Sequence, residues 1–188
     1  MMRIITGRAK GIRLNTLEGA ETRPTAERVK EAVFSMLQFD IEGRKVLDLF
    51  AGSGQMGLEA ISRGASEAIF VERSEAAVKI IKQNIEKTRL TPFCSVIRSD
   101  CLDFIKRNRG DKFDIIFLDP PYASGLYIPV LKSLNEYGCL KPTTVLVCES
   151  DFDELLEKES ELKKVYRVKK TARYGKIVIT VLEVISNE

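Results

Sequence analysis

The chain has 188 residues, of which 44% are hydrophobic and 30% charged, and its net charge is +3. This length predicts one main domain whose core needs no disulfide or metal, and the composition excludes intrinsic disorder. No apolar run is long enough for a membrane span or a signal peptide, so we expect a cytoplasmic protein without membrane attachment. Histidine is absent, which excludes imidazole bases and histidine-ligated metals, and we expect no metal site. The four cysteines show no CxxC spacing and are expected to be buried, reduced thiols.

Basic residues gather near both ends of the chain. Residues 1–30 carry Arg3, Arg8, Lys10, Arg13, Arg23, Arg28 and Lys30, and residues 163–176 carry Lys163, Lys164, Arg167, Lys169, Lys170, Arg173 and Lys176. If the fold brings both segments to one face, a polyanion such as nucleic acid would explain them. Two separate solvated surfaces are the alternative.

The first part of the chain predicts a small extension. Residues 2–14 have the pattern of a short hairpin with a turn between Gly7 and Gly11, and residues 15–24 are expected to form a loop. A helix capped by Thr25 is predicted to run to about Gln38, with an apolar stripe on one side. We therefore divide the chain into a hairpin extension, residues 1–24, and a main domain, residues 25–188.

The main domain alternates apolar strands with helices. Strands are predicted at 45–49, 68–72, 94–98, 114–118 and 144–148. One helix is predicted to follow the first strand and end near Gly64, a second to begin after Ser74, and two more to cover residues 101–107 and 126–137. Strands that are apolar throughout are covered on both faces, as in a parallel sheet. Residues 162–170 and 177–185 predict a final antiparallel hairpin with a tight turn at 173–176. The fold expected is α/β, a Rossmann-like doubly wound sheet of seven strands, mixed at one edge.

A glycine-rich segment follows the first strand of this domain. Gly52, Gly54 and Gly57 satisfy the spacing G-x-G-x-x-G, and Glu72 lies 20 residues after Gly52. Such glycines let the backbone approach a nucleoside cofactor, and the acid can bind both ribose hydroxyls. A turn needed only for strand-to-helix packing is the alternative. Asp48, just before the glycines, would repel a pyrophosphate but suits the cationic amino acid group of S-adenosylmethionine.

A second acid, Asp100, follows the third strand of the main domain. With the backbone at Cys101 and Leu102, it could bind the adenine edge of a cofactor, because ligands of these sheets lie beyond the carboxyl ends of the strands. It could equally cap the helix over residues 101–107, and the two roles are compatible.

The most specific motif is Asp119-Pro120-Pro121-Tyr122, at the end of the fourth apolar strand. An amine on an aromatic base is a poor nucleophile because its lone pair is delocalised into the ring. A carboxylate at Asp119 and a carbonyl at Pro120 could accept both N–H bonds and direct the lone pair toward an electrophile. Tyr122 could stack on the base, which contributes about 1–3 kcal/mol.

With these motifs the chain resembles class I S-adenosylmethionine-dependent methyltransferases, and Asp119 to Tyr122 resembles their [D/N]PP[Y/F] signature for exocyclic amino groups. It most closely resembles the RsmD family of 16S rRNA guanine-N2 methyltransferases. Arg3 to Gly7, Arg23-Pro24-Thr25, the helix segment from Arg28 to Phe34 and the segment from Asp48 to Ala65 are all similar to that family and in the same order. Gln55-Met56 and the stretch after Tyr174-Gly175 depart from its pattern.

The resemblance implies S-adenosylmethionine as cofactor and 16S rRNA, or the small ribosomal subunit, as partner, and we expect a monomer. It implies catalytic roles for Asp119, Pro120, Pro121 and Tyr122. Cofactor-binding residues would be Asp48, Phe50, Ala51, Gly52, Ser53, Gly54, Glu72, Arg73, Asp100, Cys101 and Asp119. RNA-binding residues would be Arg3, Arg8, Lys10, Arg23, Arg28, Lys30, Arg173 and Lys176.

Three other functions fit parts of the sequence. A DNA adenine-N6 or cytosine-N4 methyltransferase shares the motif at Asp119, but 188 residues leave little room for a DNA recognition domain. An NAD-dependent oxidoreductase would explain the glycines but not Asp119 to Tyr122. An rRNA-binding assembly factor without catalysis would not need the acidic and aromatic positions.

Overall fold

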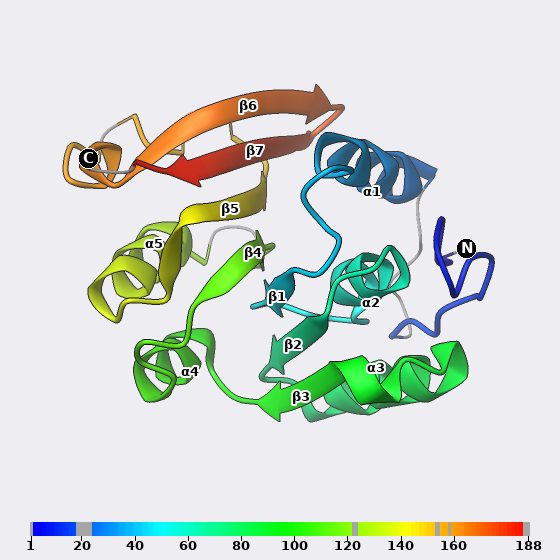
Figure 1. The fold of residues 1–188 in the computed structure, drawn as a ribbon. Helices are drawn as coiled ribbons and strands as arrows, with labels where there is room; N and C mark the ends of the chain where they lie inside the picture. Colours follow the sequence, from blue (N-terminus) through cyan, green and yellow to red (C-terminus); the bar gives the residue numbers. More distant parts are fainter. Residues whose placement is uncertain (1, 18–23, 122–123, 153–154, 158, 186–188) are drawn as a thin grey trace.

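The computed structural model describes residues 2–17, 24–121, 124–152, 155–157 and 159–185. Its seven strands form one sheet in the order β3-β2-β1-β4-β5-β7-β6 (Figure 1). The strands are β1 (Lys45–Asp48), β2 (Glu67–Glu72), β3 (Cys94–Arg98), β4 (Phe113–Leu118), β5 (Leu140–Ser150), β6 (Tyr166–Tyr174) and β7 (Ile177–Val184). The helices are α1 (Pro24–Met36), α2 (Gln55–Ser62), α3 (Glu75–Thr88), α4 (Cys101–Arg107) and α5 (Tyr127–Glu136), with short 3-10 turns at Thr91–Phe93 and Leu162–Lys164. This confirms the predicted α/β fold with a mixed seven-stranded sheet.

The order of the strands places a ligand crevice near the middle of the sheet. β1 pairs in parallel with β2 on one side and with β4 on the other, so the winding of the chain reverses between β1 and β4. In doubly wound sheets, ligands bind beyond the carboxyl ends of the strands at such a reversal. β7 is antiparallel to both β5 and β6, so the mixed edge lies where the sequence predicted it.

Helices cover both faces of the sheet (Figure 1). Val46 packs into the cluster formed with α1, α2 and α3, whereas its neighbour Leu47 packs into the cluster formed with α4 and α5. Successive side chains of a strand point to opposite faces, so an apolar run such as β4 supplies both cores. All six residues of β4 are buried. The site described below is therefore built on the ends of rigid strands.

The N-terminal segment forms the expected hairpin, although only one isolated bridge joins its two arms, between Arg3 and Arg13. Backbone hydrogen bonds from Ile4 N to Ile12 O (3.0 Å) and from Leu14 N to Met2 O (2.9 Å) complete it. Ile4 is fully buried in the same core cluster as α1 and α2. The hairpin is thus packed into the main core.

A buried carboxylate on α2 holds this hairpin in place. Glu59 accepts hydrogen bonds from the backbone N–H groups of Ile5 (2.8 Å) and Thr6 (3.0 Å), and from Arg63 Nε (2.8 Å). Lys30 Nζ lies 3.6 Å from the same carboxylate and donates to the carbonyl of Arg3 at 2.5 Å. Lys30 is only 2% exposed. The structure therefore corrects the expectation that Lys30 contacts RNA, because its ammonium is used inside the fold.

Three element boundaries differ from the predictions. α1 begins at Pro24, so Thr25 lies inside the helix and does not cap it; proline is favoured at a first helical position because its missing N–H has no helical partner there. β6 begins at Tyr166, because the amides of Lys163, Lys164 and Val165 donate to nearby carbonyls and form a local turn. β5 extends from Leu140 through Pro142, where the shift in its register with β4 accommodates the proline.

Candidate active site

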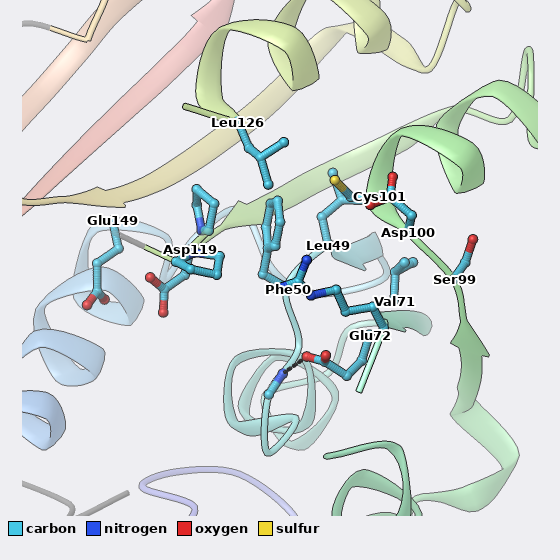
Figure 2. Close-up of a pocket in the computed structure, with 14 residues that line it drawn as sticks. Leu49, Phe50, Val71, Glu72, Ser99, Asp100, Cys101, Asp119, Leu126 and Glu149 are labelled. Carbon is cyan, nitrogen blue, oxygen red and sulfur yellow. Dashed lines mark hydrogen bonds between the residues drawn. The ribbon is translucent and has the colours of Figure 1, made fainter. Parts of the chain in front are cut away.

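A cavity of about 360 Å³ opens at the carboxyl ends of the strands (Figure 2). Its lining follows the order of the sheet, from Ser99 and Asp100 after β3, through Glu72 on β2 and Phe50 after β1, to Asp119 after β4 and Glu149 on β5. The other lining residues are Leu49, Gly52, Val71, Arg73, Cys101, Pro120, Pro121 and Leu126. The fold therefore brings the three predicted motifs to one cavity.

The glycine loop and Glu72 are fixed to each other. The backbone N–H of Gly52 donates to Glu72 Oε2 at 3.0 Å (Figure 2). The backbone N–H of Ser74 donates to Glu72 Oε1 at 2.8 Å. These two bonds hold the carboxylate at the edge of the cavity, where its remaining lone pairs can accept from a diol. The third glycine has a packing role, since a Cβ on Gly57 would lie 2.4 Å from the Phe70 ring.

Four residues predicted to bind the cofactor are not among the residues that line this cavity. Asp48 is 4% exposed and accepts a hydrogen bond from Gly57 N at 3.2 Å. Burial raises the pKa of Asp48 to about 7. Ala51 and Gly54 are buried, and the carbonyl of Ser53 accepts from the Asn84 side chain at 2.8 Å. The burial and hydrogen bonds of these residues stabilise the conformation of the loop.

The structure confirms one of the two roles expected of Asp100, the helix cap, and places the residue in the lining of the cavity. Its carboxylate accepts from the backbone N–H groups of Leu102 (2.9 Å) and Asp103 (3.4 Å), so it caps α4. Asp100 and Cys101 also line the cavity, together with Arg73 from the end of β2. A helix cap that faces a cavity can offer its carboxylate and the local backbone to a ligand at the same time.

The loop after β4 brings Asp119, Pro120 and Pro121 to the cavity. Asp119 is an exposed residue, but partial desolvation of its carboxyl by neighbouring protein atoms, together with the charges of Glu149 and Asp48, raises the pKa of that carboxyl. Burial also raises the pKa of Glu149. Tyr122, predicted to stack on a base, lies outside the described residues. The cavity thus has a surplus of carboxyl groups that favours a proton, a cation or hydrogen-bond donors.

Glu149 is the charged residue of the cavity lining that the sequence analysis missed. It lies next to the last residue of β5, and its backbone carbonyl accepts a hydrogen bond from the Tyr127 hydroxyl. An acid at the carboxyl end of an apolar strand was the signal that identified Glu72 and Asp119. The same signal applied to the fifth strand would have identified Glu149.

The predicted RNA-binding residues, Lys30 apart, have varied surroundings. Arg8, Lys10, Arg28, Arg173 and Lys176 are exposed, and Arg8 also stacks on Phe93. Arg3 is exposed too and pairs with Glu27 at 2.7 Å. Arg23 lies outside the described residues. The hairpin, α1 and the β6–β7 turn therefore each present basic side chains to solvent.

The described part of the chain contains no helix long and apolar enough to cross a membrane. Within the same residues, no group of three or more His, Cys, Asp or Glu side chains could hold a metal ion. All four cysteines are free thiols; Cys101, Cys139 and Cys148 are buried as expected, whereas Cys94 is only half-buried.

The strand order, the glycine loop joined to an acid on β2 and the Asp-Pro-Pro loop after β4 define a class I methyltransferase fold. A solved structure described as "Putative methyltransferase yhhF from Escherichia coli" matches it with a TM-score of 0.85 and 28% identity, over 99% of each chain.

The chain belongs to the family described as Conserved hypothetical protein 95, which matches residues 2–183. It is 39% identical over 184 residues to "Putative rRNA methyltransferase YlbH" of Bacillus subtilis, covering 93% of this chain and 99% of that protein. It is 36% identical over 157 residues to ribosomal RNA small subunit methyltransferase D of Haemophilus influenzae, covering 82% and 81%. The resemblance to the RsmD family is thereby confirmed.

Proposed function

We propose that this protein transfers a methyl group from S-adenosylmethionine to the N2 amino group of a guanine in 16S rRNA. The observation that carries the proposal is the position of the Asp119-Pro120 acceptors, which share one cavity with the Glu72 and Asp100 carboxylates. Relatives named as rRNA methyltransferases cover most of the chain, which supports rRNA as the substrate class.

The charge of the cavity supports S-adenosylmethionine over NAD. Asp119 and Glu149 line the cavity and Asp48 lies near Asp119, so a cationic ligand would stabilise their ionised forms, whereas a pyrophosphate would be repelled by them. A solved methyltransferase structure described as "complexed with SAH" shares the fold, with a TM-score of 0.71 at 16% identity. Glu72 would hold the ribose hydroxyls, and Asp100 with the backbone at Cys101 would hold the adenine edge.

The roles of the catalytic residues follow from the chemistry of an aromatic amine. When bound, S-adenosylmethionine supplies an electrophilic methyl group on a sulfonium. The Asp119 carboxylate and the Pro120 carbonyl would accept the two N–H bonds of the amine and turn its lone pair out of conjugation. As the N–C bond forms and the S–C bond breaks, the amine gains positive charge, and Asp119 would accept the proton that it releases. Positioning of the two reactants supplies most of the acceleration.

Transfer of labelled methyl from S-adenosylmethionine tests the proposal. Small subunits lacking the modification, naked 16S rRNA and duplex DNA would be compared, and the modified nucleoside identified by mass spectrometry. We expect N2-methylguanine in rRNA, with transfer that weakens steeply as salt rises because basic residues contact phosphates. Label in DNA adenine or cytosine would instead establish a DNA amino methyltransferase, and binding of NAD without methyl transfer would contradict the methyltransferase assignment.

The pH dependence of the reaction should report the raised pKa of Asp119. Only the ionised carboxylate can take the proton that the amine releases, so kcat/KM should rise with pH, with an inflection well above about 4, the usual value for an Asp carboxyl. A bound sulfonium favours the ionised form, so the inflection in kcat at saturating cofactor should lie at lower pH than that in kcat/KM. Identical, flat profiles from pH 5 to about 9 would contradict this role for Asp119.

A further inference from the structure

The cavity has a second carboxylate beyond Asp119, on the side away from the residues assigned to the cofactor. Asp100 and Glu72 lie at the ends of β3 and β2, Asp119 follows β4, and Glu149 lies on β5, the next strand of the sheet. Figure 2 shows the side chains of Asp119 and Glu149 next to each other at one end of the cavity, with Asp100 at the other. If the adenosine lies over β2 and β3, Glu149 lies where the ring of the target base would enter.

The Glu149 side chain is positioned but unpaired. Its backbone is held by pairing of β5 with β7, opposite Ile179, and by the hydroxyl of Tyr127. The described residues offer its half-buried carboxylate no hydrogen bond and no ion pair within 4.0 Å. A carboxylate held in a cavity without a partner has a desolvation cost that a ligand with N–H donors would offset.

We infer that Glu149 accepts a hydrogen bond from the ring N1–H of the target and so selects guanine. This inference depends on the function proposed above. Beside its amino group guanine carries a ring N–H donor, whereas adenine and cytosine carry an acceptor nitrogen in the equivalent position. A carboxylate pairs with the donor and repels the acceptor lone pair. Asp119 and Pro120 accept hydrogen bonds from the amino group that all three bases carry. Glu149 distinguishes guanine by the N–H of the ring nitrogen beside that amino group.

The size of this discrimination can be anticipated from general chemistry. Sites built to bond a substrate N–H reject analogues without it by factors of up to about 10⁴–10⁵. Because Glu149 is only half-buried and water can enter the cavity, we expect a factor of about 10² between targets with and without the ring N–H.

2-Aminopurine provides the matching probe, because it keeps the amino group of guanine and replaces the ring N–H with an acceptor nitrogen. Small subunits would be reconstituted with ligated 16S rRNA carrying guanosine or 2-aminopurine at the methylated position. We expect the wild type to methylate guanosine about 10²-fold faster than 2-aminopurine. Glu149→Gln offers both an acceptor and a donor, so the ratio of guanosine to 2-aminopurine methylation rates in this variant should fall to below about 10. Asp151→Asn removes one negative charge, as Glu149→Gln does, but at an exposed position two residues away. It should keep the wild-type ratio of guanosine to 2-aminopurine methylation rates.

Calorimetry with S-adenosylhomocysteine separates base selection from a role in holding the cofactor. We expect Glu149→Gln to bind it with unchanged affinity. An unchanged guanosine to 2-aminopurine ratio in the variant, or a wild type indifferent to the analogue, would overturn the role of Glu149 alone. So would a loss of cofactor affinity with the ratio preserved. A wild type that makes no N2-methylguanine in rRNA would overturn both this inference and the proposed function.

Discussion

The variant Asp119→Ala is expected to lose methyl transfer, with kcat reduced about 10²–10³-fold. The carboxylate acts on the amine as positive charge develops, and removing one preorganised group of this kind from an active site typically costs that factor. The loop itself should remain in place, because Pro120 and Pro121 fix its backbone and Leu118 before it is buried in β4. Single-turnover transfer to small subunits measures the loss, and filter binding should show RNA affinity within about threefold of wild type.

Two further variants make the Asp119 prediction specific. Asp119→Asn keeps one carbonyl acceptor but cannot take the released proton, so its rate should lie between those of the wild type and the alanine variant. Asp151→Ala removes an exposed carboxylate two residues beyond Glu149 and should retain full activity. Near-normal methylation by Asp119→Ala would refute the mechanism, and so would an Asn variant as slow as the alanine variant.

Much of the fold was predictable because its strands carry local signals. An apolar run such as Phe113–Leu118, bounded by a polar turn and a proline, predicts a strand covered on both faces, and the structure buries all of it. Glycine spacing predicted the loop after β1, and the acids at strand ends predicted one side of the cavity. These signals depend on neighbours in the chain, and the right-handed crossover of successive units then places the strand ends together.

The errors concern contacts between segments distant in the sequence. The sequence around Lys30 predicts an exposed lysine on the surface of α1. Only the contact with Glu59 of α2 explains why Lys30 is buried. Asp48 remains a predicted cofactor residue, and the structure adds that its carboxylate is buried and accepts a hydrogen bond from Gly57 N. The composition of residues 1–30 could not show which basic side chains would be buried in the core and which would stay exposed.

The Lys30–Glu59 contact should be a major determinant of stability. Glu59→Gln is expected to lower the free energy of unfolding by about 3–5 kcal/mol, because Lys30 then keeps a buried charge without its anionic partner. Glu59 is fully buried, and burial already lowers the pKa of Lys30, an effect that the Glu59 charge partly offsets. The glutamine would also direct an N–H₂ group at donors that include the amides of Ile5 and Thr6. Urea unfolding followed by circular dichroism measures the change.

An exposed carboxylate with two cationic partners, on the same face of the sheet, provides the control. Glu75 contacts Lys79 at 3.1 Å and Arg98 at 2.8 Å, but its side chain is 55% exposed. Glu75→Gln should therefore lower the free energy of unfolding far less than Glu59→Gln, because water screens such pairs and solvates the groups left behind. If the two variants were equally stable, the buried carboxylate would not be holding the hairpin to α2. A large loss confined to Glu59→Gln, with cleavage by protease appearing first in residues 2–17, would show that the contact secures the basic N-terminal segment beside the cofactor loop.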